Sequence, residues 1–215
     1  MAQNARRALI VIDVQNEYIT GDLPIEYPDP QISLRNIGRA MDAAQATGVP
    51  VVVVQQVAKA SSPLFAEGSV GGQLHQVVAS RPRDHFVTKT LPSAFPETNL
   101  LSWLTEREID TLSVVGYMTH NCNASTINHA LHVGLKVEFL HDASGSVSYE
   151  NCAGFASAKD IHHVFSVVLQ SRFAAVASTE EWISAVKLGQ ELERGGIYAS
   201  NQLARKHAAD YLAAK

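Results

Sequence analysis

The sequence predicts an α/β protein with a three-layer, Rossmann-like, doubly wound sheet of about six parallel strands and helices on both faces. Two observations support this fold class. Near-continuous apolar runs such as ALIVIDV at 8–14 are typical of strands that are covered on both faces. Helical segments separate these runs, and parallel neighbours in a sheet need right-handed crossovers of helix length. With 215 residues the chain fits one domain that can bury a substantial core.

Strands are expected at six places along the chain, namely 8–14, 51–56, 85–89, 111–117, 135–140 and 173–177. The first long helix is expected at 33–47, with Ser33 as its N-cap and Gly48 just after its end. Further helices are expected at 72–79, 98–107, 123–133, 151–169 and 180–188, the last of them capped by Thr179. The two loops that are expected to shape a binding pocket are 21–30 and 58–72.

A C-terminal extension, 189–215, follows the predicted domain at 1–188. Its apolar residues recur at helical spacing from about Ser200 onward, which predicts an amphipathic helix. Because no strand remains for this helix to cover, we expect it to pack on a neighbouring subunit of a homo-oligomer, a dimer or a tetramer. The alternative is a frayed tail.

Composition limits the partners. The net charge of −4 gives no electrostatic case for binding nucleic acid or an anionic membrane, so a small-molecule substrate is expected. No run of about 18 apolar residues indicates a membrane span. The first apolar run ends early, at Asp13, which argues against a secretory signal and favours a cytoplasmic protein whose two cysteines stay reduced.

Three chemically competent side chains stand at the carboxyl ends of predicted strands: Asp13, Lys89 and Cys122. Ligands of doubly wound sheets bind at that edge. Cys122 lies where a strand becomes a helix, and the unpaired N–H groups of a first helical turn favour a thiolate. Taken singly, each residue has a simpler interpretation: a carboxylate that caps backbone N–H groups, a solvated lysine and a small buried hydrophobe. The prediction of a functional site therefore depends on the combination of the three residues at one edge of the sheet.

The motifs VIDVQNEY, KTLPSAF and GYMTHNCNAST together resemble the isochorismatase-like cysteine hydrolases, a family that includes nicotinamidases, maleamate and biuret amidases and streptothricin hydrolase-like proteins. The resemblance spans most of the chain. It implies a catalytic triad of Asp13, Lys89 and Cys122. It also implies a non-proline cis peptide between Tyr117 and Met118, which aims the N–H groups of Met118 and Cys122 at one oxygen, as an oxyanion hole.

Four further residues are expected to contact the substrate. Gln15 belongs to the first motif, and Tyr18 matches an aromatic position that stacks on the ring in nicotinamidases. Phe95 could form a second aromatic wall. Of the two glutamines that end the second strand, one should face the pocket because side chains alternate along a strand, and Gln55 is our choice.

The sequence departs from the nicotinamidase pattern in one respect. Nicotinamidases carry metal-binding histidines after the second strand, where this chain has VVVVQQVAKASS. We therefore expect no catalytic metal and no cofactor. His120 is left out of the triad because a residue two positions before Cys122 in a tight turn should point elsewhere, and Cys152 is expected to be structural.

The expected activity is hydrolysis of a small, non-peptide amide by Cys122 through a thioester. Two alternatives stay open: an isochorismatase-type ether hydrolase, and a non-catalytic small-molecule-binding protein with the same fold. Some true isochorismatases lack the cysteine, so Cys122 favours amide hydrolysis. A dinucleotide-binding oxidoreductase is disfavoured, because DVQNEY replaces the glycine-rich phosphate loop after the first strand.

Overall fold

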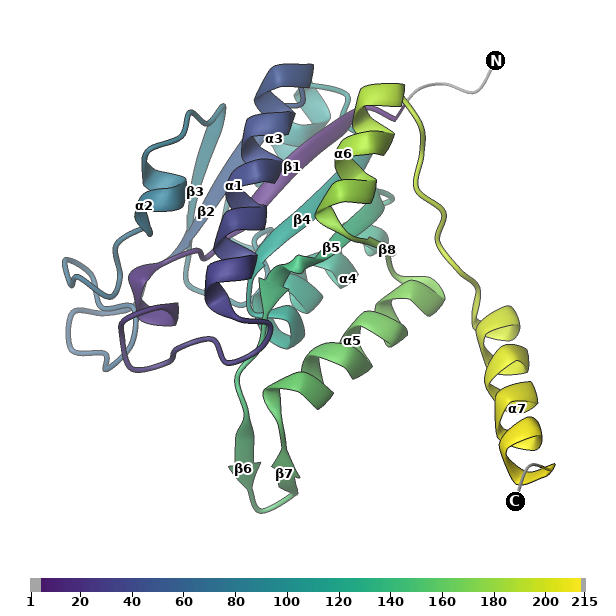
Figure 1. Ribbon diagram of the computed structural model, residues 1–215. Helices are drawn as coiled ribbons and strands as arrows, with labels where there is room; N and C mark the ends of the chain where they lie inside the picture. The colour runs from purple at the N-terminus through teal and green to yellow at the C-terminus, as the bar shows by residue number, and fades with distance from the viewer. Residues whose placement is uncertain (1–4, 214–215) are drawn as a thin grey trace.

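The computed structural model describes residues 5–213, with side chains through 208. Six parallel strands form one sheet, in the order β3 (His85–Lys89), β2 (Val51–Gln56), β1 (Arg7–Ile12), β4 (Thr111–Tyr117), β5 (Lys136–Gly145) and β8 (Ala175–Ala177) (Figure 1). The chain builds outward from β1 in one direction and then crosses to β4 on the other side, so the strand order reverses between β1 and β4. The predicted fold class is confirmed.

Helices cover both faces of the sheet (Figure 1). One face packs against α1 (Pro30–Thr47), α2 (Gln76–Ala79) and α6 (Thr179–Leu188). The opposite face packs against α3 (Leu100–Glu106), α4 (Ala124–His132) and α5 (Ala158–Arg172). Side chains of β1 alternate between these two cores, which explains why this strand has no polar face.

The backbones of β1 and β4 approach closely at Gly116. This residue has φ +107, and a Cβ built on it would lie 2.1 Å from the carbonyl oxygen of Ile12. Only glycine fits such a position. The close approach holds the ends of the two central strands together at the edge where ligands are expected.

The predicted N-caps of two helices are wrong. α1 starts at Pro30 rather than at Ser33, because the Asp29 carboxylate accepts the Gln31 N–H and Pro30 is favourable in a first turn. α6 is capped by Ser178 rather than by Thr179, and a reciprocal capping box with Glu181 fixes that start.

The predicted helix at 151–169 is wrong at its start. The segment first forms an antiparallel hairpin of β6 (Tyr149–Asn151) and β7 (Gly154–Ala156), which projects from the body of the molecule (Figure 1). α5 then begins at Ala158, where the Ser157 side chain accepts the Asp160 N–H. Cys152, expected to be structural, lies exposed in the turn of this hairpin.

The C-terminal extension contains the helix α7 (Ile197–Ala213), which lies apart from the sheet (Figure 1). Its connecting segment is attached to α5, since the Gly195 N–H donates to the Gln170 carbonyl over 3.0 Å. Several of its apolar side chains are exposed, namely Ile197, Tyr198 and Leu203. The boundary between domain and extension, and the contact with a second subunit, stay predictions. No described helix is both long and apolar enough to cross a membrane.

A buried polar cluster ties the amino ends of the strands to α6. The Arg7 guanidinium donates to the Glu138 carboxylate at 2.7 Å and 3.0 Å, and both side chains are almost fully buried. Ser113 and Trp182 also donate to Glu138, over 2.7 Å and 3.0 Å. The cluster therefore lies at the edge of the sheet opposite to the predicted site.

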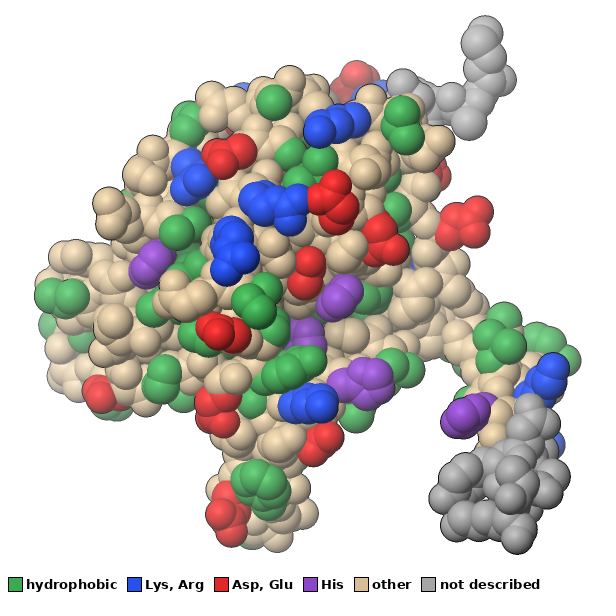
Figure 2. Space-filling model, viewed as in Figure 1, with side chains coloured by type: hydrophobic (Ala, Val, Ile, Leu, Met, Phe, Trp, Pro, Cys, Tyr) green, Lys and Arg blue, Asp and Glu red, His purple; other side chains and the backbone are tan. Residues whose placement is uncertain are grey.

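The surface built by α1 and α6 carries basic and acidic side chains interspersed with one another (Figure 2). Arg39 pairs with Glu180 and Arg81 with Asp42 on this face. Exposed pairs of this kind contribute little to stability, because water screens them. The arrangement gives this face no extended field of one sign.

Candidate active site

Three strand ends bring Asp13, Lys89 and Cys122 together. Lys89 Nζ lies 2.7 Å from Asp13 Oδ2 and 3.3 Å from Cys122 Sγ. Asp13 follows β1, Lys89 ends β3, and Cys122 follows β4, so the group forms beside the point where the strand order reverses. The sequence named these three residues from their places at strand ends, and the structure places them in contact.

All three side chains are buried. Asp13 is fully buried and adopts φ 51, the left-handed conformation, while Lys89 is 3% exposed and Cys122 is 5% exposed. Lys89 Nζ has two further acceptors, Gln56 Oε1 at 2.7 Å and the Leu91 carbonyl at 3.1 Å. The ammonium is therefore surrounded by acceptors that compensate for its removal from water.

Burial sets the protonation of the thiol. Desolvation, reinforced by the negative charge of Asp13, raises the pKa of Cys122 to about 12, although the Lys89 cation acts in the opposite direction. Desolvation also raises the pKa of Asp13, against the effect of Lys89. The expectation that the strand-to-helix junction favours a thiolate is wrong for the free protein, because burial and the neighbouring carboxylate outweigh the lysine. The direction of this pKa shift favours the thiol over the thiolate in the free protein.

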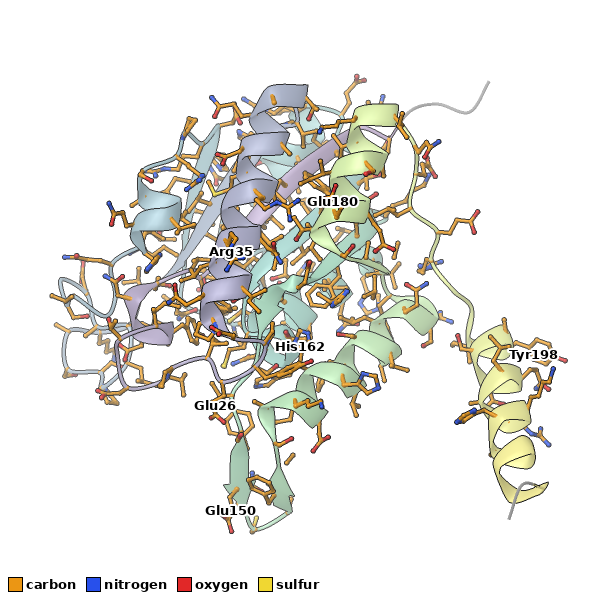
Figure 3. The ribbon with its side chains drawn as sticks, viewed as in Figure 1. Glu26, Arg35, Glu150, His162, Glu180 and Tyr198 are labelled. Carbon is orange, nitrogen blue, oxygen red and sulfur yellow. The ribbon has the colours of Figure 1, made fainter. Side chains whose placement is uncertain are left out.

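Cys122 lies in a single π-helical turn, η2 (Thr119–Asn123), that joins β4 to α4. The peptide bond between Tyr117 and Met118, just before this turn, is cis. The Met118 N–H has no backbone acceptor among residues 5–213. The turn is held from two sides: the Asn123 amide donates to the Gly116 carbonyl over 2.8 Å, and Thr119 Oγ1 contacts His162 Nδ1 of α5 at 2.8 Å. Figure 3 labels His162 beneath the sheet edge.

Two of the predicted substrate contacts are occupied by structural bonds. Gln15 donates to the carbonyls of Gln56 and Gly72, over 2.9 Å and 2.7 Å, and accepts the Gln56 N–H over 2.9 Å. Gln55 donates to the same Gly72 carbonyl over 2.8 Å. Both glutamines anchor the loop that contains Gly72 to the ends of β1 and β2, and their contact with a substrate stays a prediction.

The two predicted aromatic contacts differ in their surroundings. Tyr18, in the short helix η1 (Asn16–Tyr18), packs against Phe65 and Tyr117 with ring centroids 5.1 Å and 5.5 Å away. Its pKa is raised well above the ordinary value, first by desolvation and then by the negative charges of Asp13 and Cys122. Phe95 stacks on His129 of α4 at 4.8 Å and belongs to the core that contains Cys122. Phe95 therefore packs against α4, and both aromatic residues stay predicted substrate contacts.

Of the two glutamines that end β2, sequence reasoning chose Gln55, but the structure places Gln56 beside the triad. Gln56 and Lys89 are register partners on neighbouring strands, and their side chains meet. The alternation of side chains along β2 could have identified Gln56. Every second residue, Val52, Val54 and Gln56, points to the same face of the sheet. Val87 and Cys122 belong to the core on that face. Applied from the buried end of β2, that alternation selects Gln56 rather than Gln55 as the residue facing the triad.

Sequence reasoning also missed Tyr149 and gave His120 no role. His120 contacts Ser146 Oγ at 3.2 Å and Tyr149 Oη at 3.0 Å instead of the thiol. Tyr149 starts the β6–β7 hairpin, which only overlaps the helix predicted at 151–169, and no sequence pattern placed this tyrosine near the site. Within the described residues no three His, Cys, Asp or Glu side chains are arranged to hold a metal ion.

Comparisons with known proteins identify the family. The isochorismatase domain model matches residues 7–181. The protein in a crystal structure of an isochorismatase-family member from Burkholderia xenovorans LB400 is 72% identical in sequence to this chain. The match covers 96% of this chain and 100% of that chain, with a TM-score of 0.95. The secreted isochorismatase effector Isc1 of Verticillium dahliae is 31% identical over 137 residues, 64% of this chain and 71% of that protein. N-carbamoylsarcosine amidase of an Arthrobacter species is 28% identical over 148 residues, 61% of this chain and 56% of that protein. The chain therefore belongs to the isochorismatase family of hydrolases.

Proposed function

We propose that this protein is a cysteine hydrolase of a small, non-peptide amide and that it works through a thioester on Cys122. The observation that carries the proposal is the position of Lys89 Nζ, 2.7 Å from the Asp13 carboxylate and 3.3 Å from the Cys122 sulfur. A base, a cation and a nucleophile in mutual contact are the groups that covalent acyl transfer needs. The similarity to N-carbamoylsarcosine amidase supports an amide as the substrate class.

The raised pKa values suit a proton transfer that is coupled to attack. Burial raises the pKa of the Asp13 carboxyl above its ordinary value, which makes the carboxylate a better base than one in water. As Asp13 accepts the thiol proton, the sulfur bonds to the amide carbonyl carbon and the carbonyl oxygen gains the negative charge. Lys89 stabilises the sulfur while its charge develops.

The N–H groups of Met118 and Cys122 are proposed to hold the oxygen of the tetrahedral intermediate. The support for this role is that the Met118 N–H has no backbone acceptor within the described residues. When the intermediate collapses, the C–N bond breaks and Asp13 returns its proton to the leaving nitrogen, so ammonia or an amine departs. Asp13 then takes a proton from water, whose oxygen attacks the thioester carbon. The C–S bond breaks, the acid departs, and Asp13 returns the proton to the sulfur, which restores the thiol.

Screening a panel of small primary amides, ureides and N-carbamoyl amino acids for release of ammonia tests the proposal. With an amide that is hydrolysed, Cys122→Ala should abolish turnover, because the nucleophile is removed. Cys152→Ala should retain turnover, since Cys152 lies exposed in the hairpin turn. Intact-mass analysis of rapidly quenched wild-type enzyme should detect the acyl adduct.

Two outcomes would contradict the proposal. Turnover of isochorismate together with inactivity on every amide would favour the ether hydrolase. Saturable binding of an amide, with no product over days, would favour the non-catalytic binding protein.

A further inference from the structure

Tyr149 reaches the catalytic turn from outside the triad. Its hydroxyl lies 3.0 Å from His120 Nε2 and 4.0 Å from Met118 Sδ. The Tyr149 and His120 rings also pack edge to face, with centroids 5.2 Å apart. His120 and Met118 belong to the same short segment as Cys122, so the hydroxyl is fixed relative to the nucleophile.

His120 is itself held in place. Its Nδ1 contacts the hydroxyl of Ser146, which is fully buried, and its ring packs edge to face on Phe165 at 6.0 Å. Desolvation lowers the pKa of His120 to about 4, so the ring is neutral at neutral pH and carries one N–H.

That single proton leaves Tyr149 with capacity for a ligand. If Nδ1 carries the proton, Nε2 accepts the Tyr149 proton and the phenolic oxygen is free to accept. If Nε2 carries it, His120 donates to the phenolic oxygen and the hydroxyl proton is free to donate. A primary amide presents both a carbonyl oxygen and an N–H, so either arrangement can bind one.

The chain before Tyr149 is tied to the body of the protein. The Ser148 N–H donates to Glu26 over 3.0 Å, and Ser148 Oγ accepts the Ala158 N–H over 2.9 Å. Figure 3 labels Glu26 above the base of the β6–β7 hairpin and Glu150 toward its far end. Tyr149 therefore starts the projecting hairpin from an anchored position, which favours a fixed contact over a mobile one.

The negative charge of the Cys122 thiolate affects the pKa of two phenols, Tyr149 and Tyr18. Desolvation and the charge of Cys122 raise the pKa of the Tyr149 phenol, and the same two effects contribute to that of Tyr18. The two phenols come from η1 and β6, on different segments of the chain.

We propose that Tyr149 is a substrate-binding residue, whose hydroxyl hydrogen-bonds the amide group of a small molecule held at Cys122, and that His120 is the positioning residue that orients it. The choice of an amide rests on the proposed function. The geometry that supports the hydroxyl contact does not depend on turnover.

Alkylation of Cys122 by two reagents tests the proposal without a substrate. Iodoacetamide carries a primary amide, whereas 1-iodopropane is of similar size and has none. Measured in a Cys152→Ala background, the ratio of the two rates cancels any change in the thiolate fraction, because both reagents react with the same sulfur. Tyr149→Phe should lower the iodoacetamide rate by about threefold to tenfold, the effect of one neutral hydrogen bond, and leave the 1-iodopropane rate unchanged.

The matched control is Tyr198→Phe, the same chemical change on the exposed surface of α7, far from the site in Figure 3. It should leave both rates unchanged. His120→Leu should lower the ratio in the same direction as Tyr149→Phe, and His120→Gln, which keeps a side-chain donor, should restore part of it. Circular dichroism of each variant checks the fold.

An unchanged ratio in a folded Tyr149→Phe protein, or an equal fall in both rates, would overturn the proposal. A lowered ratio in a protein that hydrolyses none of the amides in the panel would instead count against the proposed function alone. If Tyr149→Phe fails to fold, His120→Leu decides by the same ratio.

Discussion

Gln56 and Lys89 lie opposite each other on β2 and β3, and Gln56 Oε1 accepts a hydrogen bond of 2.7 Å from Lys89 Nζ. This bond holds the ammonium between the carboxylate of Asp13 and the sulfur of Cys122. Gln56 touches neither of those two groups through its side chain, so its effect on the site passes through Lys89.

Gln56→Leu should lower kcat/KM by about tenfold or more, since a hydrogen bond to a buried charge is worth about 1.5–3 kcal/mol. The measurement is ammonia release from an amide that the wild type hydrolyses. Gln76→Leu, on the exposed side of α2, is the control and should retain wild-type kinetics. Equal activity of the two variants would show that Lys89 keeps its position without Gln56.

The pH dependence of Cys122 alkylation should follow a raised pKa. Burial first, and Asp13 second, raise the pKa of the thiol to about 12, so the iodoacetamide rate in the Cys152→Ala protein should still increase with pH at pH 9. Asp13→Asn removes a negative charge that opposes the thiolate, so it should speed alkylation at pH 8 while abolishing turnover. Lys89→Met removes the cation and should slow alkylation. A plateau below pH 8 in the parent protein would contradict the raised pKa.

Arg7→Met should destabilise the protein by about 3–5 kcal/mol, because it leaves the Glu138 carboxylate buried without its ionic partner. Urea unfolding followed by circular dichroism measures this free energy. Arg39→Met is the same substitution in an exposed pair with Glu180 and should cost no more than about 1 kcal/mol. Similar losses in both variants would mean that burial of the Arg7 pair has no special effect.

Activity should survive removal of metal ions. Dialysis against a strong chelator is expected to leave kcat unchanged, because Asp13 and Lys89 supply the base and the cation that the proposed steps require. The check is the rate of ammonia release before and after dialysis, with the metal content measured in parallel. Loss of activity that added zinc or iron restores would refute this prediction.

Deleting 197–215, which removes α7, should reduce the molar mass measured by light scattering from that of an oligomer to that of a smaller assembly. The reason is that the exposed Ile197, Tyr198 and Leu203 give this helix an apolar surface without a partner in the chain's described part. Triple replacement of these residues by Ser in the full-length protein separates loss of the apolar surface from loss of the helix. A monomeric full-length protein would exclude the predicted subunit contact.

Much of the fold could be predicted from the sequence because the buried strands are continuous apolar runs. β2, β3 and β4 begin and end at the predicted residues. The β6–β7 hairpin could not be predicted in the same way, because each of its strands spans three residues and neither packs into a core. Such a segment lacks the hydrophobic periodicity on which sequence patterns depend.

The candidate site, like the fold, could be predicted only in part from the sequence. Asp13, Lys89 and Cys122 could be predicted because each follows or ends a predicted strand, and the carboxyl ends of parallel strands lie at the same edge of the sheet. The protonation of the thiol could not be predicted, since its sign depends on whether burial or Lys89 has the larger effect, and only the three-dimensional arrangement decides that. Tyr149 lay beyond prediction because its place depends on the long-range bonds that Ser148 makes with Glu26 and Ala158.

The reversal of strand order between β1 and β4 also bears on how the protein is made. During synthesis β1 and Asp13 leave the ribosome first, but one of the two neighbours of β1 is β4, which is translated only after β2 and β3. Until then the carboxylate of Asp13 has no thiol beside it, and one side of β1 is an open edge that favours pairing with another chain. A ribosome-bound chain that stops before β4 therefore lacks Cys122 and exposes an edge that favours aggregation. Once β4 has paired, burial slows alkylation of Cys122, so loss of its reactivity reports that the centre of the sheet has closed.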